Sequence, residues 1–322
     1  MKKILSLLLV TTFLCLSFCI PVFAADQSQR PVWIISHQCN SPAEHVRAAI
    51  DAGVNAIEVD VRYSFSQGSW VLNHNASGCQ WADKLSDLFA QPGLGDQICL
   101  ILFDIKEPEY IVNQDLVGTT HDLMNRYGIS SEDLYIVYSV SSLDSVTDYF
   151  IPGFLNSLGS NEGICVDYEN DVSAVSNAFR NKGFDRTWYA NGIFSGLDLT
   201  GNIKASCLEA AKRRDRGEFK KVESWTVSDN GSTGFKARLI DWGCDAIIVG
   251  DSARDNALYY LSSRELSSVR LATSEDNPFE YYGPSSNRTG SLISEGSLWI
   301  IIAVVIVAAA ASVVLVNKKK KA

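Results

Sequence analysis

The chain has 322 residues, 46% of them hydrophobic and 20% charged, which is enough apolar material to bury the core of one large domain. A formal net charge of −9 and a pI near 5.0 exclude partners held by bulk positive charge, such as nucleic acid or an anionic membrane surface. The cysteines that follow residue 24 match no zinc-binding spacing, and the sequence does not fix how they pair in disulfides.

Both ends of the chain have the composition of targeting segments. Residues 1–24 open with Met-Lys-Lys, continue through an apolar run and finish at small residues, which is the pattern of a signal peptide. Residues 298–316 are uncharged and span about 28 Å as a helix, enough to cross a bilayer, and the basic tail at 317–322 predicts a cytoplasmic end. A buried core helix is the alternative. We therefore expect an exported domain over 25–283, a linker over 284–297 and a membrane anchor, at the surface of a bacterial cell.

Between these ends, apolar and β-branched runs alternate with helical stretches. The runs predict strands at 32–36, 56–61, 98–105, 134–140, 163–168, 187–193, 222–227 and 245–250. Ser41 and Glu44 have the spacing of a capping box at the start of a helix that Gly53 closes, and Trp81 falls on the apolar face of a helix expected over 81–90. Strands that alternate with helices in this way form a parallel sheet.

A further strand-like run at 69–74 follows the second predicted strand after only a few residues. Because a parallel crossover needs a dozen or more residues, this run must return as an antiparallel hairpin. The eight remaining strands, in the roughly 250 residues that such a fold needs, predict an α/β (β/α)8 TIM barrel with a short β-hairpin after strand 2. A doubly wound open sheet is the alternative.

Paired polar residues mark the ends of two neighbouring predicted strands. Glu58 and Asp60 lie two residues apart on the second strand, and Asp104 and Lys106 have the same spacing on the third. Side chains two apart share one face of a strand, and the active sites of TIM barrels lie at the carboxyl ends of the strands. Buried carboxylates that face one another are unfavourable unless a cation lies between them. Three oxygen ligands therefore predict a divalent site, with Mg²⁺ as the expected ion and Ca²⁺ as the alternative.

Two histidines and a tryptophan are expected beside these carboxylates. His37 ends the first predicted strand, His74 ends the hairpin and Trp225 lies on the seventh strand. Each position also has an alternative role. The histidines could be structural, the carboxylate pair could be charges at a sheet edge, Asp104 and Lys106 could form a salt bridge, and the tryptophan could belong to the core. His45 and His121 fall in predicted helices, where we expect structural roles. Two histidines beside a metal can act as general base and general acid in phosphodiester cleavage, while the lysine stabilises charge on the phosphate.

The order WIISH, NAIEVDV, NH, LFDIK and SWTV resembles the glycerophosphodiesterase-like superfamily. His37 is followed by Gln38 and Cys39, where general glycerophosphodiesterases have His-Arg-Gly. This favours the sphingomyelinase D / phospholipase D family known from sicariid spider venoms, which has bacterial and fungal relatives. The run ATSEDNPFEYYG at 272–283 is similar to the C-terminal segment that plugs the bottom of the barrel in that family. The resemblance covers residues 31–283.

The resemblance implies a role for each residue of the predicted site. His37 and His74 match the family's two catalytic histidines. Its Mg²⁺ ligands are matched by Glu58, Asp60 and Asp104. Lys106 matches its phosphate-contacting lysine, and Trp225 matches its pocket tryptophan. The histidines are expected as base and acid respectively, in an order that stays open. In that family a hydroxyl of the substrate attacks phosphorus and leaves a cyclic phosphate. The expected function is Mg²⁺-dependent, phospholipase D-type cleavage of sphingomyelin or a lysophospholipid at a membrane surface, by a monomer with no nucleic-acid partner.

Departures from the family pattern lie at the headgroup end of the pocket. Ser228 follows Val227 where the spider pattern has aspartate, and Gly250 stands near the position of the family's strand-eight asparagine. The loop after His74 is shorter, with Cys79 alone where spider forms have a disulfide. These changes do not affect the residues expected to act on the phosphate, but they leave the preferred headgroup undetermined. No further acidic residue is assigned to hold a water, which favours cyclisation; a hydrolytic glycerophosphodiester phosphodiesterase and a non-catalytic surface-binding barrel are the alternatives.

Overall fold

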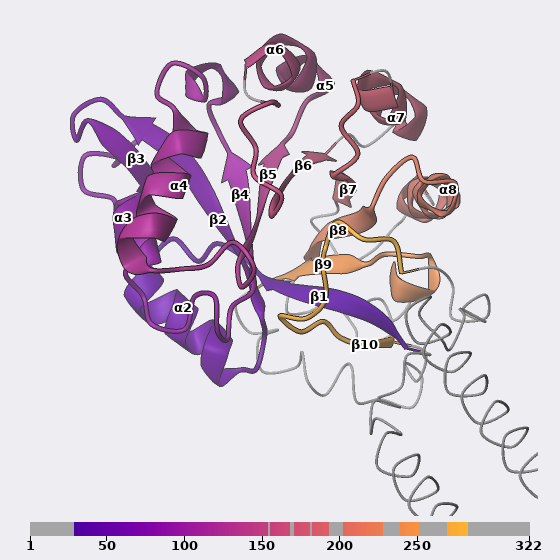
Figure 1. Ribbon diagram of the computed structural model, residues 1–322, viewed down its shortest axis with the longest axis horizontal. Coiled ribbons are helices and arrows are strands. Elements are labelled where there is room, and N and C mark those ends of the chain that lie inside the picture. Colours follow the sequence, from indigo (N-terminus) through magenta and orange to yellow (C-terminus); the bar gives the residue numbers. More distant parts are fainter. Residues whose placement is uncertain are drawn as a thin grey trace, which may run out of the picture. The chain divides into compact units, whose positions relative to one another are not determined.

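The computed structural model describes residues 29–153, 155–167, 171–180, 182–192, 202–227, 239–250 and 269–282. Its strands form a closed ring of parallel neighbours, in which β9 pairs back to β1 (Figure 1). In ring order they are β1 (Arg30–Ser36), β2 (Ala56–Ser64), β4 (Leu100–Ile105), β5 (Tyr135–Val140), β6 (Glu162–Asp167), β7 (Thr187–Gly192), β8 (Lys221–Val227) and β9 (Ala246–Val249). The predicted (β/α)8 barrel is confirmed, and the open sheet is excluded.

Helices surround this ring on its outside (Figure 1). They are α2 (Pro42–Asp51), α3 (Leu85–Phe89), α4 (Leu116–Tyr127), α5 (Leu143–Ser145), α6 (Ile151–Gly153), α7 (Val172–Arg180) and α8 (Asn202–Asp215), with the single turns η1 (Pro108–Tyr110) and η2 (Val146–Phe150). The predicted hairpin forms through β3 (Ser69–Leu72), which runs antiparallel to β2. A further strand, β10 (Val269–Leu271), pairs with the start of β1. The sequence did not predict it, because three residues are too short to show a period.

Side chains alternate along each strand between the inside of the barrel and the surrounding helices. The inward-facing apolar residues form a core inside the ring; they include Trp33, Ile35, Leu100, Leu102, Val137, Cys165, Trp188 and Ile248. The outward-facing ones form a second, larger core with the helices. The lower part of the barrel is therefore filled by side chains, and inward positions nearer the carboxyl ends of the strands are left for polar groups.

The segment after β10 closes the bottom of the barrel, as the resemblance predicted for residues 272–283. Phe279 lies in the inner core, against Gly163 of β6, where a Cβ atom would overlap the Phe279 ring. The indole of Trp188 donates to the carbonyl of Pro278 at 3.1 Å. Glycine at position 163 is thus required by the close approach of the plug.

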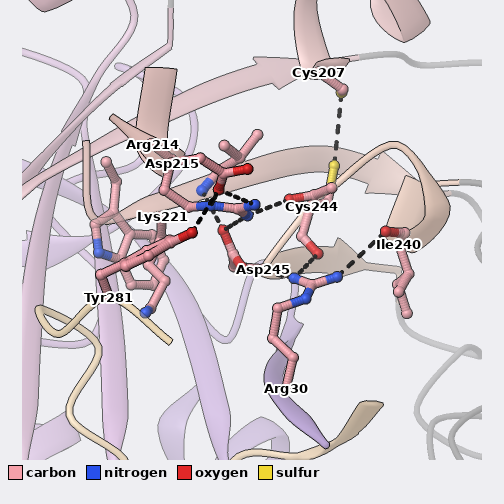
Figure 2. Close-up of polar contacts among 12 residues, drawn as sticks. Arg30, Cys207, Arg214, Asp215, Lys221, Ile240, Cys244, Asp245 and Tyr281 are labelled. Atoms are coloured by element: carbon pink, nitrogen blue, oxygen red, sulfur yellow. Dashed lines mark hydrogen bonds and ion pairs between the residues drawn. The ribbon is translucent and has the colours of Figure 1, made fainter. Parts of the chain in front are cut away.

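A buried ion network joins the N-terminal ends of β1, β8 and β9 (Figure 2). Asp245 accepts hydrogen bonds from Arg30 and from Arg214, each at 2.6 Å, and from the backbone N–H of Val222 at 2.9 Å. Burial alone would raise the pKa of the Asp245 carboxyl, but the two arginines hold it below its usual value. The base of the barrel is therefore fixed by a carboxylate that has all its hydrogen-bond partners.

Two local predictions are wrong. Ser41 makes no side-chain capping bond to α2; its backbone N–H lies 3.5 Å from His45 Nδ1 instead. Trp81 is 83% exposed in a turn, because α3 begins only at Leu85, after a bond from the Lys84 N–H to the Asp87 carboxylate at 2.8 Å.

The chain divides into one compact unit that ends at Tyr282 and a second unit from Gly283 onward. The signal peptide predicted at 1–24, the linker at 284–297 and the anchor at 298–316 all lie outside the described residues and stay predictions. Within the described ranges, no helix is both long and apolar enough to cross a membrane.

Candidate active site

Three carboxylates meet near the carboxyl ends of β2 and β4. The parallel register pairs Asp60 with Asp104, and Glu58 lies two residues before Asp60, on the same face of β2. One oxygen from each carboxylate lies within 4.8 Å of the others, and Glu58 and Asp60 are buried. The prediction placed the pair at the end of its strand. In the structure β2 continues past Asp60 into the hairpin, and only its barrel portion, which pairs with β4, ends at Val61.

Lys106 is the positive charge of this cluster. Its Nζ lies 2.7 Å from Asp60 Oδ1 and 2.5 Å from Asp104 Oδ2. Burial would raise the pKa of Asp60, but Lys106 holds it below its usual value. Burial raises the pKa of Asp104 in spite of Lys106. Burial also raises the pKa of Glu58 well above its usual value, and the neighbouring carboxylates add to this shift. The single positive charge of Lys106 therefore does not neutralise the charge of three carboxylates.

The two predicted histidines flank the carboxylates. His37 Nε2 lies 3.9 Å from Glu58 Oε2, and His74 Nδ1 lies 3.0 Å from Asp60 Oδ1. The backbone carbonyl of His74 accepts two bonds from Arg62, at 3.2 and 3.1 Å, and these fix the residue after β3. Both imidazoles line the same cavity as Glu58. The structure thus brings together the histidines and carboxylates that the sequence assigned to one site.

Sequence reasoning missed two residues of the turn after β1 that orient the carboxylates. Gln38 has a left-handed backbone (φ +50°), and its N–H donates to Glu58 Oε2 at 2.6 Å. The amide of Asn40 donates to Asp60 Oδ2 at 2.6 Å and accepts from the Asp60 N–H at 2.9 Å. Their closeness to His37 in the chain was the one available signal. Residues other than glycine rarely adopt this left-handed backbone, and those that do cluster at functional sites.

The cavity at the top of the barrel has a volume of about 290 Å³. Its described lining consists of His37, Gln38, Glu58, His74, Leu102, Asp104, Ile105, Lys106, Ser139, Ser141, Asp167, Glu223, Trp225 and Ile248. Trp225 enters from β8, as predicted, and packs on Gly192 of β7, where a Cβ would overlap the indole. The absence of a side chain at position 192 therefore sets how Trp225 lies beside the cavity.

Two further acids of the lining were also missed. Asp167 ends β6, and Glu223 lies two residues before Trp225 on the inward face of β8. Their signal in the sequence was the same period of two that identified Glu58 and Asp60. The sequence analysis assigned no further acidic residue to hold a water, and these two acids of the lining must therefore be weighed in the chemistry.

The histidines predicted to be structural lie outside the cavity lining. His45 Nδ1 is 3.0 Å from the backbone carbonyl of Gln38, where it supports the turn after β1. His121 pairs with the buried Glu162 at 2.8 Å, and Glu162 also accepts from the Tyr138 hydroxyl at 2.8 Å. Neither imidazole is among the described residues that line the cavity.

Solved phosphodiesterase structures share the fold of this barrel. A phosphodiesterase from Oleispira antarctica, in complex with sn-glycerol-3-phosphate, has a TM-score of 0.51 and 13% identity over 72% of this chain and 97% of its own. A glycerophosphodiester phosphodiesterase from Parabacteroides distasonis has a TM-score of 0.52 and 15% identity over 73% and 99%. At this identity the likeness concerns the fold.

The family of the chain is shown by its sequence. Residues 27–279 match the model of the Sphingomyelinase D/Phospholipase D family, so the chain belongs to that family. It is 26% identical to a sphingomyelinase D of Arthroderma benhamiae over 77% of this chain and 78% of that protein. It is 27% identical to a dermonecrotic toxin of Loxosceles intermedia over 79% of this chain and 90% of the toxin. The chain is therefore a phospholipase D-like phosphodiesterase.

Proposed function

We propose that the chain is a Mg²⁺-dependent enzyme that releases the headgroup of sphingomyelin or a lysophospholipid and leaves a cyclic phosphate. The observation that carries this proposal is the convergence of three carboxylates, within 4.8 Å of one another, with two histidines and a lysine at the top of one barrel. Relatives named sphingomyelinase D support the choice of lipid. The substrate is expected at a membrane surface, reached from outside the cell.

The acidic triad fits a divalent cation. Lys106 brings one positive charge to three carboxylates, which leaves a formal excess of two negative charges. Glu58 Oε1 is buried and has no hydrogen-bond partner among the described residues. Glu58, Asp60 and Asp104 would hold Mg²⁺, which prefers oxygen ligands. When bound, the ion would act as a Lewis acid that stabilises negative charge on the phosphate oxygens.

The histidines would divide the two proton transfers. His74 presents Nδ1 to Asp60 Oδ1 at 3.0 Å, which orients the ring and leaves Nε2 to donate a proton to the departing alcohol oxygen. His37, 3.9 Å from Glu58, would accept the proton of the attacking hydroxyl. Lys106 would contact a phosphate oxygen. These roles keep the assignment of His37 as base and His74 as acid.

Cyclisation is favoured because the attacking hydroxyl is already part of the substrate. An intramolecular nucleophile can save on the order of 7–11 kcal/mol relative to a free one. Asp167 and Glu223 favour a second candidate, a hydrolytic glycerophosphodiesterase, because either carboxylate could hold a water beside the cavity.

Product analysis in ¹⁸O-water separates the two candidates. The full chain in mild detergent is given lysophosphatidylcholine with Mg²⁺ or with EDTA, and products are followed by mass spectrometry. We expect no turnover in EDTA, recovery with Mg²⁺ and an early, unlabelled cyclic phosphate. His37→Ala and His74→Ala should each lower turnover by about 10²–10⁴-fold and leave the fold intact. Early product that is linear and ¹⁸O-labelled would assign the chain to the hydrolytic class, and full activity in EDTA would remove the metal from the mechanism.

A further inference from the structure

Arg62 joins the turn that carries His74 to the end of a neighbouring barrel strand. It stands on β2 just past Val61, the last residue of β2 that pairs with β4, and it is paired with Val71 of β3 in the hairpin. Its Nε and Nη2 donate to the backbone carbonyl of His74, at 3.2 and 3.1 Å, and its Nη1 donates to Glu107 Oε1 at 2.7 Å. The Arg62 side chain is 14% exposed and is not among the described residues that line the cavity. Any effect of Arg62 on the reaction must therefore pass through the two segments that it holds.

Glu107 fixes the direction in which the Arg62 side chain points. It follows Lys106 directly after β4, and its side chain is 24% exposed. A guanidinium is planar and presents its N–H groups as a rigid fork, so a carboxylate on one arm sets where the other donors lie. The carbonyl of His74 is thus held at a fixed place relative to β4, the strand that carries Asp104 and leads into Lys106.

His74 depends on this support because it is the second residue after β3 and belongs to no helix or strand. The turn around it is folded largely on itself, since the side-chain amide of Asn73 donates to the carbonyls of Asn75 and Ser77 at 2.8 and 2.9 Å. The imidazole of His74 is 51% exposed, so packing constrains the ring little. Arg62 therefore anchors the main chain from which the ring projects.

We propose that Arg62, held by Glu107, is a positioning residue that sets where the His74 imidazole meets the departing alcohol. This inference rests on the proposed function, in which His74 is the general acid. A misplacement of about 1 Å can cost on the order of 10²-fold in rate. Loss of Arg62 should therefore lower kcat, and it should change KM little because the carboxylates and the lysine of the site are left in place.

The test is a double-mutant cycle on the full chain in mild detergent, with Mg²⁺ and lysophosphatidylcholine. Arg62→Met keeps an unbranched apolar stem and removes every donor. It should lower kcat by about 10–100-fold and change KM by less than about threefold. In a His74→Ala background the same substitution should lower kcat by less than about threefold, because no imidazole is left to position. A merely structural role would lower kcat by the same factor in both backgrounds.

Three other variants complete the experiment. Arg62→Lys keeps the charge and should retain more activity than Arg62→Met, and Glu107→Ala should lower kcat by about 3–10-fold because it frees the guanidinium. Arg47→Met is the matched control: it breaks an exposed ion pair with Asp51 on α2, at 2.9 Å, and should leave kcat unchanged. If Arg62→Met does not fold by circular dichroism, the cycle of Glu107→Ala with His74→Ala decides the matter.

Hydrogen exchange followed by mass spectrometry adds a measurement that does not depend on activity. Amides of residues 73–79 should exchange faster in Arg62→Met than in the wild type or Arg47→Met, and unchanged exchange there would contradict the inference. Equal losses of kcat in both backgrounds, or wild-type kcat in Arg62→Met, would overturn it and leave the phosphodiesterase activity standing. A wild type that shows no turnover with Mg²⁺ would instead refute the proposed function, and hydrogen exchange alone would then decide whether Arg62 holds the turn.

Discussion

Lys221 offers a quantitative test of how this barrel tolerates a charge in its interior. The side chain is 2% exposed; its ammonium donates to the carbonyl of Glu280 and lies 4.5 Å from the centre of the Tyr282 ring and 5.2 Å from that of Trp33. Burial lowers the pKa of Lys221 to about 7; Asp245 opposes this shift, and the nearby arginines add to it. The barrel therefore holds a lysine that loses its proton near neutral pH.

The sign of the pH dependence follows from this lowered pKa. Between pH 7 and 10.5 the unfolded chain keeps the Lys221 proton and the folded chain loses it, so this group makes the fold more stable as pH rises. One proton corresponds to about 1.4 kcal/mol per pH unit, and the whole difference between 10.5 and about 7 to about 5 kcal/mol. Below pH 7 both states are charged, and the full cost of burying the ammonium remains.

Lys221→Met isolates this contribution. The free energy of unfolding is measured with urea and tryptophan fluorescence at pH 7, 8 and 9. We expect the value for Lys221→Met minus that for the wild type to fall by about 2 kcal/mol from pH 7 to pH 9, because the folded lysine is still half protonated at pH 7. The control is Lys220→Met, because Lys220 is more exposed and pairs with Asp185 at 2.8 Å. Its difference from the wild type should not follow this slope. A Lys221→Met difference that stays constant across the range would refute the argument.

Three further predictions concern the site and its surroundings. Asn40→Ala removes both amide contacts to Asp60, one of the three carboxylates proposed to hold Mg²⁺. It should raise the Mg²⁺ concentration needed for half-maximal activity by about 10–100-fold, with little change in melting temperature. Phe65 and Trp81 are 65% and 83% exposed on and after the hairpin that carries His74; serine at both should slow turnover of lipid in vesicles and spare a short-chain substrate in solution. Cys207 and Cys244 are buried with their sulfurs 3.6 Å apart. Refolding with oxidised glutathione should form a disulfide between them. Peptide mapping that finds both cysteines alkylated, as free thiols are, would contradict this.

The period of two along the strands explains why so much of the site could be predicted. It placed Glu58 with Asp60, and Asp104 with Lys106, on shared inward faces, and the parallel register brought the two pairs together. The same rule applies to Glu223, but the sequence does not say at what height an inward position stops facing the inner core and starts facing the cavity.

Other features depend on backbone geometry that no pattern shows. Glycine or asparagine at a position would have indicated a left-handed backbone, but this position holds Gln38. The Gln38 N–H reaches Glu58 only because of that left-handed geometry. Trp81 has helical spacing to its apolar neighbours, but the chain begins α3 four residues later, so the pattern was followed one turn too far.

The two ends of the barrel treat buried charge in opposite ways. At the base, Asp245 has an arginine on each oxygen, and its pKa is lowered, so its negative charge stabilises the fold. At the top, burial raises the pKa of both Glu58 and Glu223; among the described residues Glu58 faces His37 at 3.9 Å, and Glu223 faces a thiol. A fold selected for stability alone would pair or remove these acids. Glu58, whose oxygen lies within 4.8 Å of oxygens of Asp60 and Asp104, marks the place where a divalent cation would be stabilised on binding.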